Sequence, residues 1–120
     1  MANHTYNIRI KTGDDPMGGT DSNVFIQLFG TNGQTESIFL PPQDIFAFES
    51  GGTDKFVLQA PAIGDLTRCC VGHDNSEGES GWLVEAVTVW DNDSGKQWHF
   101  VFNQWLGVEE SGQLSACVDL

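Results

Sequence analysis

The residues best suited to chemistry in this sequence are oxygen-bearing side chains in two glycine-rich loops, residues 12–22 and 72–81. Hard cations such as Ca²⁺ take six to eight oxygen ligands from carboxylates and backbone carbonyls. Asp21 and Asp74 would supply carboxylates, and the glycines let the backbone turn its carbonyls inward. The pattern predicts a Ca²⁺ site where residues 14–21 and 72–79 of these loops meet residues 43–49 of a third loop. The alternative is a pair of solvated turns whose side chains cap their own backbone.

Apolar residues lie in or beside the same loops and a third loop, residues 43–53. They are Met17, Phe46 and Phe48. Gathered at one tip, they would enter a bilayer, where each buried CH₂ contributes about 0.8 kcal/mol. These three are the predicted membrane-contact residues; the alternative is that each covers the core.

The sequence has no arrangement typical of an enzyme. Its histidines, His4, His73 and His99, fall in a tail, a loop and a strand face, and no nucleophile elbow or phosphate-binding loop occurs. The run from Asp91 to Gly95 is similar to the start of a Ca²⁺-binding loop, but its twelfth position is Phe102 rather than glutamate. We predict a hairpin turn there and no catalytic activity in this chain.

The charge composition limits the possible partners. There are 17 acidic and 5 basic residues, and the net charge is −12. Nucleic acid requires a basic face, and anionic lipid would not attract this chain by charge alone. A bound divalent cation would reverse the charge locally. We therefore predict membrane lipid head groups or a protein partner, and no nucleic acid.

Cysteine usage and the amino end bear on the compartment. An odd count of three, Cys69, Cys70 and Cys117, without metal-type spacing is a poor disulfide framework. We predict reduced cysteines that act as small apolar residues in strands. The first residues alternate in polarity, unlike a signal peptide. We predict a cytoplasmic domain peripheral to a membrane, with an extracellular location kept open by sequons at Asn3 and Asn92.

Alternating polarity predicts the fold. Tyr6, Ile8 and Ile10 alternate with polar neighbours, which is the period of a half-buried strand. Similar runs recur with frequent turn signals and no helical period, which is typical of an antiparallel β-sandwich in a single domain, residues 1–120. The expected strands are residues 6–11, 24–29, 35–40, 55–60, 66–71, 82–90, 97–102 and 112–120. The expected core aromatic residues are Phe56, Trp82, Trp98, Phe100 and Trp105.

Four ordered segments, which together cover nearly the whole chain, resemble the PLAT domain, named for polycystin, lipoxygenase and alpha-toxin. The segments contain Thr12-Gly13-Asp14 with Gly19-Thr20-Asp21, Phe48-Glu49-Ser50-Gly51 with Asp54-Lys55-Phe56, Ile63-Gly64-Asp65-Leu66 with His73-Asp74-Asn75 and Gly81-Trp82-Leu83, and Val101 to Leu106. The His-Asp-Asn loop and the ending Asn103-Gln104-Trp105-Leu106 are more similar to polycystin-type members than to lipoxygenases.

The resemblance implies an eight-stranded sandwich of two four-stranded antiparallel sheets. It also implies a non-catalytic module of a larger protein that binds membrane lipid or a protein partner, often with Ca²⁺. Carried onto this sequence, the metal site comprises Gly19, Asp21, Asp74 and Asn75, with a carbonyl from Gly19 and carboxylates from the two aspartates.

The resemblance departs at a second Ca²⁺ site that some members have. That site uses an Asn-Asp pair just before the residue that matches Phe48 in this sequence. Here Phe46 and Ala47 stand in its place, with Asp44 three residues further back. The expected consequence is a more apolar loop, to which no second Ca²⁺ site is assigned.

The predicted function is therefore Ca²⁺-assisted targeting of a larger protein to membrane lipid, by a domain that is monomeric in isolation. One alternative is a metal-independent protein-interaction module that uses an exposed sheet or edge. Another is a sugar-binding accessory domain, which Trp82 or Trp90 exposed on a flat face would favour.

Overall fold

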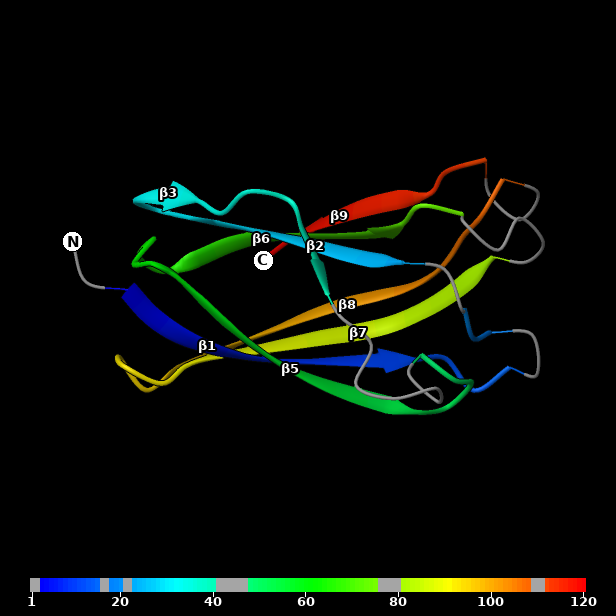
Figure 1. The fold of residues 1–120 in the computed structure, drawn as a ribbon, viewed down its shortest axis with the longest axis horizontal. Coiled ribbons are helices and arrows are strands. Elements are labelled where there is room, and N and C mark those ends of the chain that lie inside the picture. Colours follow the sequence, from blue (N-terminus) through cyan, green and yellow to red (C-terminus); the bar gives the residue numbers. More distant parts are fainter. Residues whose placement is uncertain (1–2, 16–17, 21–22, 41–47, 76–80, 109–111) are drawn as a thin grey trace.

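The computed structural model describes residues 3–15, 18–20, 23–40, 48–75, 81–108 and 112–120, which form two antiparallel sheets packed face to face (Figure 1). One sheet has the order β5-β1-β7-β8, made of β5 (Thr53–Pro61), β1 (Asn3–Thr12), β7 (Trp82–Asp91) and β8 (Lys96–Leu106). The other has the order β3-β2-β6-β9, made of β3 (Gly33–Gln34), β2 (Val24–Gly30), β6 (Leu66–His73) and β9 (Ser115–Asp119), with β4 (Ile38–Leu40) also paired to β2. The predicted antiparallel β-sandwich is confirmed.

The second sheet has five strands where four were expected, because the run predicted as residues 35–40 does not form one continuous strand. Thr35 lies between β3 and β4, and its hydroxyl accepts the Leu28 N–H at 3.0 Å while its own N–H donates to the Leu28 carbonyl. A side-chain oxygen thus takes the place of a backbone acceptor in the ladder. The strand is divided at this residue.

The core lies between the sheets and follows the alternation read from the sequence. Tyr6, Ile8 and Ile10 of β1 are fully buried, while their neighbours face outward. Among the predicted core aromatic residues, Phe56, Trp82 and Phe100 are buried and Trp98 packs partly against them. Trp105 differs, because it pairs with Leu83 on the outward side of the sheet and is only half-buried. Within the described residues, no helix is long and apolar enough to cross a membrane.

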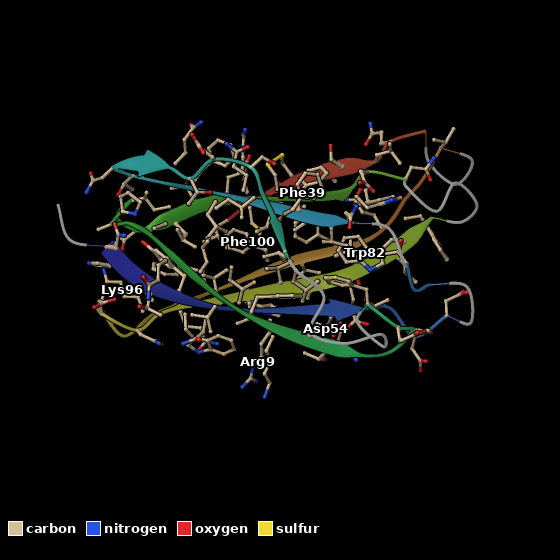
Figure 2. All side chains as sticks on the ribbon, viewed as in Figure 1. Arg9, Phe39, Asp54, Trp82, Lys96 and Phe100 are labelled. Carbon is tan, nitrogen blue, oxygen red and sulfur yellow. A yellow bond between two sulfur atoms is a disulfide. The ribbon has the colours of Figure 1, made fainter. Side chains whose placement is uncertain are left out.

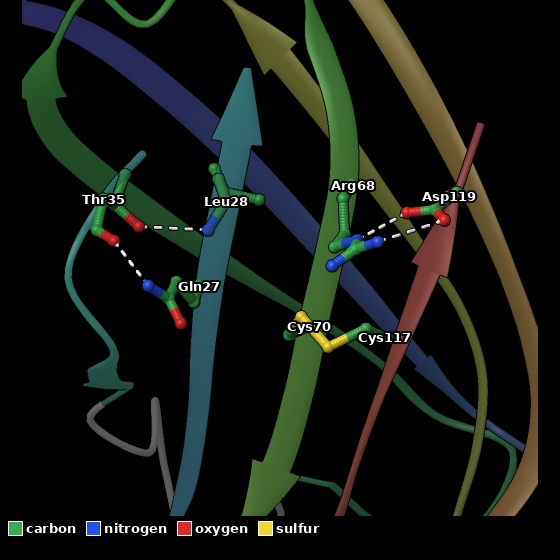
Figure 3. The surroundings of a disulfide bond; sticks show 7 residues. All are labelled: Gln27, Leu28, Thr35, Arg68, Cys70, Cys117 and Asp119. Atoms are coloured by element: carbon green, nitrogen blue, oxygen red, sulfur yellow. Dashed lines mark hydrogen bonds and ion pairs between the residues drawn. A yellow bond between two sulfur atoms is a disulfide. The ribbon is translucent and has the colours of Figure 1, made fainter. Parts of the chain in front are cut away.

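The prediction that all three cysteines are reduced is wrong for two of them. Cys70 on β6 and Cys117 on β9 are cross-strand partners joined by a disulfide (Figure 3). Adjacent residues of a strand point to opposite faces, so Cys69 faces the core while Cys70 faces outward to meet Cys117. Cys69 is free and buried, and burial raises the pKa of its thiol far above the ordinary value, which keeps it unreactive.

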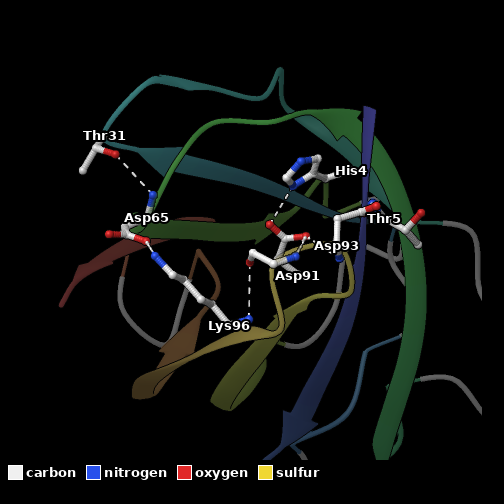
Figure 4. Close-up of polar contacts among 8 residues, drawn as sticks. His4, Thr5, Thr31, Asp65, Asp91, Asp93 and Lys96 are labelled. Atoms are coloured by element: carbon white, nitrogen blue, oxygen red, sulfur yellow. Dashed lines mark hydrogen bonds and ion pairs between the residues drawn. The ribbon is translucent and has the colours of Figure 1, made fainter. Parts of the chain in front are cut away.

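The turn between β7 and β8 is a hairpin, as predicted for the aspartate-rich run. The Asp91 carboxylate accepts the N–H groups of Asp93 and Ser94 and contacts the His4 ring at 2.7 Å (Figure 4). Burial acts to raise the pKa of Asp91, but the hydrogen bonds from His4 and the turn outweigh it, so this pKa lies below its usual value. The carboxylate therefore closes the turn and fastens it to β1.

Candidate functional site

The predicted loops meet at one end of the sandwich, on the right of Figure 1. We call this the loop end and define it by residues 13–20, 48–52, 73–75 and 107–108, as far as the structure describes them. It lies where β1, β6 and β8 finish and where β2 and β7 begin. Antiparallel connection brings these distant segments to the same place.

The first loop is held against β7 and the 48–52 segment by backbone hydrogen bonds. The Gly13 N–H donates to the Leu83 carbonyl at 2.7 Å, and the Leu83 N–H donates to the Gly18 carbonyl at 2.9 Å. The Thr20 N–H donates to the Phe48 carbonyl at 3.0 Å. These bonds fix the backbone on both sides of Gly19.

Gly19 has two properties that matter for a cation site. A Cβ atom there would lie 2.7 Å from the Phe48 carbonyl oxygen, so only glycine permits this close approach of two loops. Its own carbonyl accepts no hydrogen bond within the described part of the chain. The Gly18 carbonyl, by contrast, is already used by Leu83.

Asp74 joins the loop after β6 to the start of β2. Its Oδ1 accepts the Asn23 N–H at 3.1 Å and its Oδ2 accepts the Asn23 side-chain amide at 2.9 Å. The Asp74 N–H in turn donates to the Asn23 carbonyl at 3.0 Å. This exposed carboxylate is oriented by a residue that follows the predicted ligand Asp21 by two positions, while Asp21 itself lies outside the described residues.

Asn75 is positioned by the buried ring of His73. The His73 Nε2 donates to the Leu106 carbonyl at 2.7 Å, and its Nδ1 accepts the Asn75 N–H at 3.2 Å. Both roles together require the neutral tautomer that carries its proton on Nε2. Asn75 has a φ of 56°, a left-handed conformation that asparagine tolerates well. The buried histidine thus anchors the predicted ligand loop to the end of β8.

The prediction that Phe48 contacts a membrane is corrected by the packing. Its side chain is 3% exposed, stacks on Phe56 with ring centroids 5.6 Å apart and meets Trp82 edge-on at 5.5 Å. A φ of 58° and a 2.7 Å bond from its N–H to Asp54 turn the ring inward. Met17 and Phe46, the other two predicted contacts, lie outside the described residues.

Val108 is an exposed apolar residue at the loop end that sequence reasoning missed. It is 62% exposed and lies two positions after Leu106, the residue whose carbonyl accepts a hydrogen bond from His73. The only signal for it is a valine placed directly before two glutamates outside any apolar run. Loop residues of this kind carry no periodicity from which exposure can be inferred.

Neither Trp82 nor Trp90 forms the flat open surface that would favour sugar binding. Trp82 is fully buried and its Nε1 donates to the Thr12 hydroxyl at 3.0 Å. Trp90 is half-buried on the outward side of its sheet, where the Arg9 guanidinium lies 4.8 Å above its ring. Its Nε1 donates to Gln97 at 2.7 Å. One face of the Trp90 indole is therefore covered by the Arg9 guanidinium.

An antiparallel sandwich whose loops gather at its two ends is an architecture that many small β domains share. The sequence pattern of the PLAT/LH2 domain matches residues 6–117, and the chain belongs to this family. The resemblance read from the sequence is confirmed.

Relatives place the domain in much longer proteins. The chain is 36% identical over 105 residues to human lipoxygenase homology domain-containing protein 1, covering 88% of this chain and 5% of that protein. It is 37% identical over 105 residues to mouse polycystin-1-like protein 3, covering 87% and 5%. A calcium-dependent 11R-lipoxygenase structure superposes with a TM-score of 0.69 at 25% identity, covering 97% of this chain and 17% of that one. In such relatives the domain is a non-catalytic module.

Proposed function

We propose that this domain is a non-catalytic targeting module that attaches a longer protein to membrane lipid through its loop end, assisted by one Ca²⁺ ion. The observation that carries the proposal is the placement of the exposed Asp74 carboxylate against Asn23, at the junction of two loops. It is supported by family membership and by the calcium dependence of the 11R-lipoxygenase that shares the fold.

The donor set suits a hard cation. Gly19 offers a carbonyl with no hydrogen-bond partner in the described residues, and Asp74 offers a carboxylate. We assign Asp21 as the second carboxylate ligand. Asn75, beside Asp74 in the second loop, is assigned as a further ligand, and water completes the coordination. All of these donors are oxygens, as Ca²⁺ requires, and no thiolate or imidazole that would favour Zn²⁺ is assigned.

The apolar part of the proposed membrane contact consists of Met17 and Phe46, and we now add Val108. Bound at the loop end, Ca²⁺ would offset part of the chain's net charge of −12 and allow anionic head groups to approach. The exposed valine would then enter the interfacial region beside them.

The experiment is sedimentation of the domain with phosphatidylserine-containing vesicles, with Ca²⁺ and with a chelator, combined with calorimetric titration of Ca²⁺. We expect pelleting only with Ca²⁺. Asp74→Ala should weaken Ca²⁺ binding by about tenfold or more, since even outer-shell partners of bound metals contribute that much.

The matched control is Asp65→Ala. Asp65 is also an exposed carboxylate, but it lies at the opposite end and pairs with Lys96 (Figure 4). This variant should bind Ca²⁺ and vesicles like the parent domain. If calorimetry showed no Ca²⁺ binding to the parent domain, the proposed metal site would be wrong. If equal amounts pelleted with and without Ca²⁺, the proposed role of Ca²⁺ in lipid binding would be wrong.

A further inference from the structure

The outward side of the β5-β1-β7-β8 sheet gathers most of the positive charge of an acidic protein. We call it the cationic face and define it by Arg9, Lys11, Lys55, Val57 and Trp90. The chain has five basic residues in all, and three of them are on this face. Figure 2 shows Arg9 pointing away from the sandwich, into solvent.

These three cations form no ion pair with a carboxylate of the described residues. Within the described part of the chain, the ion pairs of lysine and arginine are Arg68 with Asp119 and Lys96 with Asp65. Arg9 instead stacks on Trp90, and the Lys11 ammonium reaches the Gly51 carbonyl at 3.5 Å. Among the described residues, the basic side chains outside the cationic face are therefore paired with carboxylates, whereas those on it are not.

The strand register places two like charges opposite each other on this face. Arg9 on β1 is the direct cross-strand partner of Lys55 on β5. Like charges placed directly opposite each other are unfavourable in a sheet. An anion bound between them would remove that repulsion and would form charge-assisted hydrogen bonds with both side chains.

The shape of the face defines the rest of the ligand. Arg9, Lys55, Val57 and Trp90 line an open hollow of about 550 Å³, and Val57 is 69% exposed. A second hollow, of about 330 Å³, begins on the other side of Arg9 and Trp90 and is lined by polar groups that include Lys11, Glu85 and His99. The first hollow therefore fits an anionic group with an apolar side chain beside it.

The net charge of the chain favours an acidic peptide segment over an anionic bilayer as the ligand of this face. An anionic bilayer laid against this sheet would meet the field of the whole molecule, which carries −12. A narrow acidic segment meets mainly the nearby cations, because the remaining charges are screened over about 8 Å at physiological ionic strength. Moreover, a sheet face at right angles to the loop end stays accessible when that end rests on lipid (Figure 1).

We propose that the cationic face is a docking surface for an acidic peptide segment of a protein partner, with a carboxylate between Arg9 and Lys55 and an apolar side chain on Val57 and Trp90. The surface is separate from the loop end and needs no metal. It would let one domain hold lipid and a protein partner at the same time.

The test uses a fluorescein-labelled peptide of alternating glutamate and phenylalanine, with a glutamine-for-glutamate peptide as its control. Anisotropy is measured in the presence of a chelator. We expect saturable binding of the acidic peptide alone. Arg9→Glu with Lys55→Glu should weaken it by about tenfold or more, the scale expected when a charge contact is reversed.

The matched control reverses Arg68 and Lys96 to glutamate, which lowers the net charge equally but leaves the cationic face intact. This variant should bind the peptide within about twofold of the parent, because those two cations lie elsewhere. Amide shifts induced by the peptide should fall in β1, β5 and β7. Circular dichroism confirms that each variant is folded.

Three outcomes would overturn the proposal. One is no binding of the acidic peptide to the parent domain. Another is equal loss of binding in the two double variants, since peptide binding would then depend on the net charge of the domain and not on the cationic face. The third is metal-independent pelleting with phosphatidylserine vesicles that the Arg9 and Lys55 reversal abolishes, because it would assign the face to lipid.

Discussion

The two outward faces of this sandwich use their cations in opposite ways. On the five-stranded sheet, Arg68 is paired with Asp119, and a disulfide joins the same two strands nearby (Figure 3). On the four-stranded sheet, Arg9 and Lys55 face each other without any carboxylate from the described residues. The comparison separates a face whose contacts are satisfied internally from one that is open to a partner.

This difference shows where stability and binding reside in the domain. The disulfide joins β6, in the interior of its sheet, to the edge strand β9. The cationic face has no such link, and its described hydrogen bonds leave Arg9 and Lys55 unpaired. Substitutions on the two faces should therefore change different measured quantities, stability on one face and binding on the other.

Removing the disulfide should have the largest effect on folding. Cys70→Ala with Cys117→Ala releases a link between residues separated by 47 positions and should lower the free energy of unfolding by about 2–4 kcal/mol. Urea denaturation of parent and variant measures the difference. Peptide binding to the cationic face should be unchanged. Equal stability of parent and variant would show that the disulfide does not hold the sheet.

Single charge reversals should act with opposite signs on the two faces. Lys55→Glu places a carboxylate opposite Arg9 and should raise the free energy of unfolding by about 0.2–1 kcal/mol. Arg68→Glu places like charges opposite each other and should lower it by a similar amount. Thermal and urea unfolding of both variants test this. A decrease in both would mean that Arg9 and Lys55 do not repel each other.

The smallest effect concerns the titration of Asp119. Hydrogen bonds from Arg68, opposed by desolvation and aided by the Arg68 charge, hold the pKa of this carboxyl below its ordinary 3.8. Because the pKa of Asp119 is lower in the folded state, its pairing with Arg68 contributes fully to the free energy of unfolding above pH 3.8. This contribution is lost as the pH falls through the folded-state pKa. Carboxyl NMR titration should show a low midpoint that Arg68→Gln raises. If the midpoint of Asp119 were unchanged in the Arg68→Gln variant, Arg68 would not be the cause of the lowered pKa.

Much of the fold was readable from the sequence, because alternating polarity reports which face of a strand is buried. The alternation of Tyr6, Ile8 and Ile10 predicts their burial, and Asp91 to Gly95 forms the expected turn. Family membership and the non-catalytic character of the module in relatives also agree with the sequence reading. The predicted location and monomeric state remain predictions.

The errors share a physical cause, which is dependence on contacts between distant residues. The pairing of Cys70 with Cys117 depends on β9 lying beside β6, and two adjacent cysteines do not reveal it. Phe48 lies in a loop without periodicity, and its burial depends on Phe56 and Trp82. The cationic face likewise exists only because Arg9 pairs across to Lys55.

The position of the disulfide has a mechanical consequence for a module within a long chain. Tension applied beyond Leu120 would peel the edge strand β9 away from β6 one hydrogen bond at a time. Peeling would stop at Cys117, only a few residues in, because the covalent link passes the load to β6 in the interior of the sheet. Under force, the carboxyl side of the domain would extend by a few residues and then behave as a stiff element.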